Sequence, residues 1–405
     1  MNTSHSATKS QSHTHPQVPP PPPPQRQTAA HYLEAHHAAS IKQMVKEAHA
    51  RDASDIHIRV GQVPRFRIRG EMVVAEGHAR VTPEILEAYL AEILSPAQRK
   101  QFAETKELDT AIFYPGFLRG RVNCFDSLTG GAIVLRLISL DVPSIDGLSL
   151  PLVLKNIVSK PQGLVLVTGP TGCGKSTTIA AMIRHLNETT HKHIVTIEDP
   201  IEYVHSSQQC LISQREVGLH TQEFFHALRA VLREDPDVIL IGEMRDRITI
   251  NTALQAAQTG HLVLGTLHTR NAINAVNRLL NLYNPDEQPA MRIQIVESLV
   301  AVIAQLLLPT TDNRRIAVHD ILINTPAMQD YLLKGEDDEA LRLMEDDTME
   351  GMQLMNQALY EQLLIGRLTI ENALQVSPDP SALERMLRTG GIDGTSSARE
   401  WMMRK

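Results

Sequence analysis

The chain separates into three stretches by the spacing of its hydrophobic positions. Between residues 31 and 140, apolar positions first recur at helical spacing and then alternate with polar ones in segments such as 55–60 and 64–70. This pattern predicts helices and half-buried strands that together form a small α+β domain. From residue 152, continuous apolar runs alternate with helical segments, which is typical of a mainly parallel sheet covered on both faces. Beyond residue 290, the spacing predicts mostly helices.

Turn-forming residues mark the boundaries between these stretches. Two prolines and a glycine within residues 141–151 indicate a linker. A Ser/His/Gln-rich start that ends in a run of prolines indicates a disordered arm. The predicted organisation is a disordered arm (1–30), an N-terminal α+β domain (31–140), a linker (141–151), an α/β core (152–325), a helical C-terminal region (326–390) and a flexible tail (391–405).

Composition narrows the functional classes. The 405-residue chain has a net charge of −7, so no overall basic field attracts nucleic acid. Its three cysteines, Cys124, Cys173 and Cys210, include no C-x-x-C pair, which argues against a disulfide framework or a four-cysteine zinc site. The apolar run 299–308 is shorter than the ~20 residues that cross a bilayer. We therefore expect a cytoplasmic protein without a transmembrane segment, able to dock on a membrane protein. The acidic run 336–350 predicts a solvated helical face or loop, with a partner surface as the alternative.

One run carries the most specific chemistry in the chain. Residues 163–178 read GLVLVTGPTGCGKSTT, an apolar strand followed by the spacing G-x-x-x-x-G-K-[ST] and a helix. Glycines let successive backbone N–H groups turn toward phosphate oxygens, and the helix adds its positive amino-terminal end. Lys175 is expected to reach the β- and γ-phosphates of ATP, and Ser176 to bind Mg²⁺. The predicted nucleotide-binding residues are Gly169, Pro170, Thr171, Gly172, Cys173, Gly174, Lys175, Ser176 and Thr177.

Three further clusters follow in the same α/β stretch, and we expect them at the sheet edge where open α/β sheets hold ligands. The run 197–202 carries carboxylates that can polarise water, and a later apolar strand delivers Glu243 in the manner of a Walker B motif. The run 259–269 carries His261 and His268, which can donate hydrogen bonds to phosphate or carboxylate. A histidine or an acid beside a strand is more often structural. Here both follow a phosphate loop, and phosphoryl transfer needs a cation, a metal-holding acid and a water-orienting group.

These four runs together resemble a known family. GPTGCGKSTT, IEDPIEYVH, LREDPDVILIGEMRD and TGHLVLGTLHT look like the Walker A, Asp box, Walker B and His box of the secretion ATPase superfamily. Within it they most resemble the PilT/PilU ATPases that power type IV pilus retraction. Residues 54–57 resemble the family's SDLH strand and residues 351–353 a late GMQT segment. The resemblance covers most of residues 38–390. It implies a RecA-like P-loop ATPase core, a PAS-like N-terminal domain and a homohexameric ring with ATP held between protomers.

The resemblance also implies roles for individual residues. Glu202 would be the general base of the Asp box, and Glu243 would hold Mg²⁺ partly through water, together with Ser176. His261 and His268 would be the His-box residues, with His268 preferred as the phosphate sensor. Arginines of the N-terminal domain would reach a nucleotide, in a neighbouring protomer, as arginine fingers; charge on the strand surface is the alternative. These arginines are Arg119, Arg121 and Arg136.

The function implied by the resemblance is a hexameric motor for type IV pilus retraction and hence twitching motility. Its expected partner is an inner-membrane platform protein at the pilus base, reached from the cytoplasm. Residues 326–334 lack the arginines usual in PilT chains, which favours an auxiliary PilU-like motor that needs a paralogous retraction ATPase. Alternatives are a pilus-assembly, type II or type IV secretion ATPase and a nucleotide-binding regulatory subunit. Cys173 replaces the usual serine of the loop, which suggests sensitivity to thiol oxidation.

Overall fold

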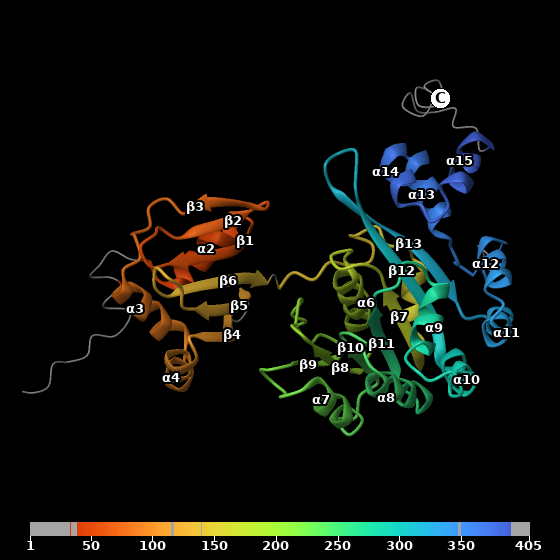
Figure 1. Ribbon diagram of the computed structural model, residues 1–405, viewed down its shortest axis with the longest axis horizontal. Helices are drawn as coiled ribbons and strands as arrows, with labels where there is room; N and C mark the ends of the chain where they lie inside the picture. Colours follow the sequence, from red (N-terminus) through yellow and green to blue (C-terminus); the bar gives the residue numbers. More distant parts are fainter. Residues whose placement is uncertain (1–32, 34–38, 115–116, 139, 347–349, 390–405) are drawn as a thin grey trace, which may run out of the picture. The chain divides into compact units, whose positions relative to one another are not determined.

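The structure is a computed structural model that describes residues 33, 39–114, 117–138, 140–346 and 350–389 (Figure 1). The predicted arm and tail fall outside these residues. The chain divides into two compact units. The first comprises Met1–Asp109 and Val122–Arg136, and the second comprises Thr110–Arg121 and Leu137–Lys405.

The N-terminal part of the chain forms a six-stranded sheet in the order β3-β2-β1-β6-β5-β4. Helix α2 contacts β1, and both bury the apolar positions whose spacing predicted them, such as Met44 on the helix and Ile56 on the strand. The expected start of a helix at Thr82-Pro83 is confirmed, because the Thr82 hydroxyl accepts from the Ile85 N–H. The elements are α2 (Ile41–Ala50), β1 (Ala53–Arg59), β2 (Arg65–Ile68), β3 (Glu71–Val74), α3 (Pro83–Ile93), α4 (Pro96–Thr105), β4 (Glu107–Tyr114), β5 (Leu118–Phe125) and β6 (Ala132–Ile138).

The second unit contains a seven-stranded sheet in the order β13-β12-β7-β11-β10-β8-β9. Strands β12, β7, β11, β10, β8 and β9 are parallel, and β13 pairs antiparallel to β12. The strands and the helices between them are α5 (Val153–Val158), β7 (Gly163–Thr168), α6 (Lys175–Thr189), β8 (His193–Glu198), β9 (Leu211–Glu216), α7 (Phe224–Val231), β10 (Val238–Ile241), α8 (Arg247–Gln258), β11 (Leu262–Leu267), α9 (Ile273–Leu280), α10 (Gln288–Ser298), β12 (Leu299–Pro309) and β13 (Arg315–Ile323). The predicted parallel sheet and its four apolar strands are confirmed.

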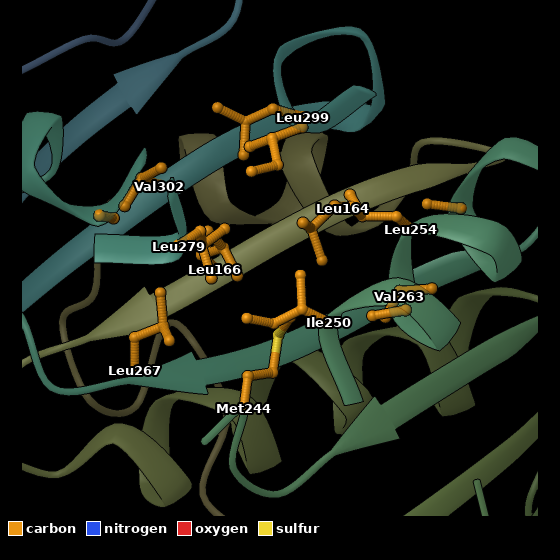
Figure 2. Packing of buried hydrophobic residues seen from close by; sticks show 14 of the residues in the cluster. Leu164, Leu166, Met244, Ile250, Leu254, Val263, Leu267, Leu279, Leu299 and Val302 are labelled. Atoms are coloured by element: carbon orange, nitrogen blue, oxygen red, sulfur yellow. The ribbon is translucent and has the colours of Figure 1, made fainter. Parts of the chain in front are cut away.

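Helices cover both faces of this sheet, which explains its continuous apolar strands. Figure 2 shows Leu164 and Leu166 of β7 on the same side as Ile250 of α8 and Leu279 of α9. The intervening Val165 belongs to the opposite cluster, which includes the buried residues of α6. Because β7, β8, β10 and β11 are parallel, their carboxyl ends meet at one edge of the sheet. The loops that carry the sequence motifs start at that edge.

The expectation of helices beyond residue 290 is wrong for residues 299–323. This stretch forms β12 and β13, and β12 lies between β7 and β13 with most of its residues buried. A short apolar run that is buried on both faces has no period that separates a strand from a buried helix, so the sequence pattern misled. From residue 326 the helical prediction is confirmed by α11 (Pro326–Lys334), α12 (Asp337–Asp346), α13 (Met355–Leu364), α14 (Ile370–Val376) and α15 (Pro380–Thr389).

Most of the acidic run 336–350 forms a helix, one of the two conformations expected for it, helix or loop. Residues 337–346 form α12, whose acidic side chains are exposed or half-buried while Ala340 and Met344 face the core. Residues 347–349 fall outside the described part. Within the residues that the structure describes, no helix is both long and apolar enough to cross a membrane.

Candidate functional site

A cavity of about 670 Å³ opens at the carboxyl edge of the seven-stranded sheet. It brings together side chains that are distant in sequence but follow adjacent parallel strands, as expected for this class of sheet. All four sequence motifs contribute to its lining. The lining includes Thr171, Gly172, Gly174, Lys175, Ser176, Thr177, Glu198, Glu202, Tyr203, Glu243, Arg245, His268, Leu307 and Arg315.

The glycine-rich loop between β7 and α6 has the backbone that its sequence requires. Gly172 and Gly174 have φ of +80° and +90°, a left-handed conformation that favours glycine. Gly174 is also the N-cap of α6, so the cavity receives the positive end of a 15-residue helix. A Cβ on Gly169 would lie 2.4 Å from the carbonyl oxygen of Gln305 on β12, so no larger residue fits there. The loop is therefore packed tightly against the sheet on its far side.

The Lys175 side chain folds back over this loop. Its Nζ donates to the carbonyl oxygen of Gly169 at 2.7 Å and to that of Pro170 at 3.2 Å. These carbonyls hold a positive charge at the cavity wall, beside backbone amides of the helix start. A polyanion such as a nucleotide phosphate chain suits this combination of charge and donors.

Glu243 follows β10 and lines the same cavity as the glycine-rich loop. Its carboxylate accepts from the Arg245 guanidinium at 2.5 Å and lies 3.3 Å from His268 Nε2. The hydrogen bond from Arg245, together with the charges of Arg245, His268 and Lys175, holds the pKa of Glu243 below its usual range, although partial burial opposes this. Glu243 is therefore ionised at neutral pH and presents a carboxylate to the cavity.

The donor set at the cavity fits a magnesium ion that accompanies a nucleotide. The Ser176 residue and the ionised Glu243 line the same cavity, and hydroxyl and carboxylate oxygens are the ligands that Mg²⁺ prefers. Within the residues that the structure describes, no group of three or more His, Cys, Asp or Glu side chains is placed to hold a metal. Two protein ligands are consistent with an ion that keeps several waters and binds mainly phosphate oxygens.

The two histidines of the His box lie at opposite ends of β11. His268 follows the carboxyl end of the strand and lines the cavity. His261 precedes the amino end, where its Nδ1 lies 2.9 Å from the Ala256 carbonyl and 3.3 Å from the Thr259 hydroxyl. The six residues of β11 separate the two by roughly 20 Å at 3.3 Å per residue. The cavity of this chain therefore gathers His268 and not His261.

The Asp-box loop, which carries Glu202, is fixed by two carboxylates, the half-buried Glu198 and the buried Glu216. Glu198 ends β8, where its carboxylate accepts from the Thr196 hydroxyl at 2.7 Å and the Gln214 amide at 3.2 Å. Burial raises the pKa of Glu198, and these bonds and one from the Glu202 backbone N–H partly offset the rise. Glu216, at the end of β9, accepts from the Ile201 N–H at 3.0 Å. Glu202 itself is exposed in the cavity lining.

The predicted arginine fingers have partners within the chain. Arg119 is buried, and its guanidinium donates to Glu216 of the same unit. In the first unit, Arg136 Nε donates to the buried Asp55 at 3.0 Å, with 71% of its side chain exposed. Arg121 is half-buried on β5. Arg119 therefore supports the Asp-box loop through Glu216, whereas the Arg136 side chain is largely solvent-exposed. Their role as arginine fingers stays a prediction.

Comparison with known proteins identifies the chain. A family model described as type II/IV secretion system protein matches residues 34–383. The chain belongs to this family. It is 41% identical over 333 residues to the type IV pilus retraction ATPase PilT of Pseudomonas aeruginosa, covering 81% of this chain and 95% of PilT. It is 40% identical over 338 residues to the type IV pilus ATPase PilU of the same organism, covering 83% and 88%. A crystal structure of the pilus retraction motor PilT with bound ADP has a TM-score of 0.80 and 41% identity, covering 86% of this chain and 100% of that one.

In this type II/IV secretion system protein, the environment of Cys173 differs from the sequence prediction, and some charged residues of the site were not predicted. Cys173 is buried, and burial raises the pKa of its thiol although nearby Lys175 lowers it. The thiolate form that oxidation requires is therefore disfavoured, which argues against the sensitivity to thiol oxidation suggested by the sequence. Sequence reasoning also assigned no role to Arg245, which forms an ion pair with Glu243, and it did not single out Glu198 within the run 197–202. Arg245 and Glu198 both lie within recognised motifs. Their position near a motif carboxylate was the sequence signal that could have identified them.

Proposed function

We propose that the chain is an ATP-hydrolysing motor of type IV pilus retraction that works as a homohexamer. Membership of the family and the fold support nucleotide binding at the cavity, and the matched relatives PilT and PilU are pilus ATPases. The observation that carries the proposal is the convergence of Lys175, Glu243 and His268 in one cavity. A cation, an ionised acid and a hydrogen-bond donor at one site are the parts that phosphoryl transfer needs.

The geometry suggests how each side chain acts on ATP. The Lys175 ammonium exchanges its two carbonyl partners for phosphate oxygens when the nucleotide binds. Glu243 stays ionised beside Arg245. Together with Ser176 it would hold a Mg²⁺ ion, which would supply positive charge to the phosphoryl group when bound. Glu202 stands exposed in the cavity, on a loop that Glu198 fixes, and takes the proton from the attacking water. His268 contacts Glu243 and acts as the phosphate sensor.

The motor role requires partners outside this chain. In the proposed assembly, Arg136 of one protomer reaches the nucleotide of the next, and each turnover moves the N-terminal domain against the ATPase core. The movement is passed to an inner-membrane platform protein at the pilus base, from the cytoplasmic side. A pilus-assembly or secretion ATPase is the competing function, because the family model covers secretion proteins as well.

Deletion of the gene in a piliated strain tests the direction of the motor. A retraction motor leaves excess static pili, whereas an assembly ATPase leaves none. Complementation with wild-type protein and with Lys175→Ala shows whether nucleotide hydrolysis is required. Normal pilus number and dynamics in the deletion strain would exclude pilus assembly and any retraction role that a second ATPase cannot replace.

A specific observation favours an auxiliary role within retraction. Helix α11 carries Met328, Gln329 and Asp330 where the resemblance to PilT predicts an arginine-containing motif, and Met328 is fully buried. Asp330 accepts from Lys334 at 2.6 Å, which neutralises the single cation of α11. The surface of α11 therefore suits a different partner from the one that an arginine-containing surface would bind. Expression as the sole retraction ATPase tests the idea by labelled-pilus imaging: unaided retraction would contradict it.

A further inference from the structure

One amide side chain is buried in an otherwise apolar strand, directly behind the phosphate loop. Gln305 lies in the middle of β12, in the sequence AVIAQLLLP, and is 1% exposed. An amide moved from water to an apolar interior is destabilising unless its hydrogen bonds are replaced. The contacts of Gln305 therefore explain why a polar residue is retained at this position.

Three hydrogen bonds satisfy the Gln305 amide. Its Nε2 donates to the carbonyl oxygen of Cys173 in the phosphate loop at 2.6 Å. Its Oε1 accepts from the Thr178 hydroxyl in α6 at 2.7 Å and lies 3.1 Å from Nε2 of His319 on β13. A carbonyl can only accept, so the Cys173 contact fixes which end of the amide faces the loop. The opposite end then requires a proton on His319 Nε2.

These bonds clamp the loop and the first turn of α6 to the sheet. Thr178 is 1% exposed and His319 is 2% exposed, so water does not compete for the amide. Burial lowers the pKa of His319 to about 4, which keeps the ring neutral at physiological pH and leaves one ring nitrogen as donor. A Cβ at Gly174 would lie 2.9 Å from Gln305 Nε2, which shows how closely the amide approaches the loop backbone.

Peptide geometry connects this clamp to the cavity. In a trans peptide, the carbonyl of one residue and the N–H of the next point in opposite directions. The Cys173 carbonyl points toward Gln305, behind the loop, so the Gly174 N–H points to the other side. Gly174 lines the cavity, and it is the residue that starts α6. The Gly174 N–H is thereby aimed at the position of a bound phosphate.

We propose that Gln305 is a positioning residue that holds the Cys173–Gly174 peptide so that the Gly174 N–H binds nucleotide phosphate. The inference rests on the proposed function, because it assigns a role toward the same nucleotide. The strand also supplies Leu307 to the cavity lining, two residues from Gln305 and on the same side of the strand. β12 thus contributes to the site from behind the loop as well as at the cavity wall.

The test compares two variants by ADP affinity, measured with a fluorescent ADP, and by thermal stability. Gln305→Met keeps the length of the side chain and removes the donor to Cys173. Thr178→Val removes a donor to the same amide and leaves the Cys173 contact intact. Each loses a buried hydrogen bond and some stability, but we expect Kd for ADP to rise about ten- to hundredfold only in Gln305→Met, as for loss of a hydrogen bond to a charged group. Thr178→Val is expected to stay within about threefold, less than one such bond.

Hydrogen exchange of the wild-type protein tests whether the Gly174 N–H binds phosphate, even if Gln305→Met fails to fold. On ADP binding the Gly174 amide should gain protection, while the Cys173 amide, already bonded to the Pro170 carbonyl, should change little. No gain at Gly174, or equal affinity losses in both variants, would overturn the inference. A wild-type chain that binds no ADP would overturn the proposed function with it. Binding by wild type and Gln305→Met alike would overturn only the role of Gln305.

Discussion

Replacement of Asp320 by asparagine should stabilise the protein, and more so as pH rises. Asp320 lies on β13 and is 3% exposed. Its Oδ2 accepts from the Ala272 N–H at 3.3 Å, at the start of α9, whereas Oδ1 has no hydrogen-bond partner among the described residues. Burial raises the pKa of Asp320 from 3.8 to about 7, and the bond from Ala272 offsets only part of this. The folded state therefore favours the protonated carboxyl.

The sign and size of this stability difference follow from the difference between the folded-state and unfolded-state pKa values of Asp320. A carboxyl with a raised folded-state pKa destabilises the fold progressively as pH rises from 3.8 to about 7. Since one pKa unit corresponds to about 1.4 kcal/mol, the full effect above pH 7 is about 4 kcal/mol. About 3 kcal/mol of this develops between pH 5 and 8. An asparagine side chain cannot ionise, so Asp320→Asn should gain this increment relative to wild type.

Thermal unfolding of both proteins at pH 5 and pH 8 measures the increment. For domains of this size, 1 kcal/mol shifts Tm by roughly 2–4 °C, so the advantage of the variant should grow by roughly 6–12 °C between the two pH values. Burial lowers the pKa of His319 to about 4, and both proteins carry this histidine, so its contribution cancels in the comparison. Asp338→Asn, at an exposed position of α12, is the control and should show no such growth. An advantage that is equal at both pH values would refute the reasoning.

Three further predictions address the site. Lys175→Ala should abolish ATP hydrolysis and most ATP affinity in filter-binding and phosphate-release assays, while the circular dichroism spectrum stays unchanged; tight ATP binding with normal turnover would disprove the site. Glu202→Gln should keep ATP affinity and lower kcat about 10²–10⁴-fold; if Glu243→Gln abolishes turnover and Glu202→Gln does not, their roles must be exchanged. An inactive Arg136→Ala protein mixed with Lys175→Ala should recover part of the ATPase activity if sites are shared between protomers; no recovery at any mixing ratio would argue for sites within one chain.

The phosphate loop could be predicted from sequence because its chemistry is local. Residues 163–178 contain the strand, the glycines with left-handed φ and the helix start, and each constrains its immediate neighbours. The parallel strands could be predicted for the same reason, since burial on both faces leaves a continuous apolar run. The presence of Glu243 and His268 at the site could be predicted because each follows such a strand. Their mutual contact at 3.3 Å also depends on the pairing of β10 with β11.

The remainder of the site depends on contacts between residues that are distant in sequence. Gln305 bonds to Cys173 across 132 positions and to Thr178 across 127. Nothing local to Gln305 indicates these partners, and the apolar residues around it obscured even the strand. Arg119 meets Glu216 across 97 positions, so its sequence context resembled a functional arginine while the structure gives it a supporting contact. Such pairings arise from the topology of the sheet.

Two carboxylates that line the cavity, Glu243 and Glu198, have environments that move their pKa values in opposite directions. Arg245 lowers the pKa of Glu243, whereas burial raises the pKa of Glu198. Carboxyl groups whose environments move their pKa values apart can serve as fixed charge and as proton acceptor within one site. The negative charge of Glu202 also contributes to the raised pKa of Glu198, so the two carboxyl groups interact.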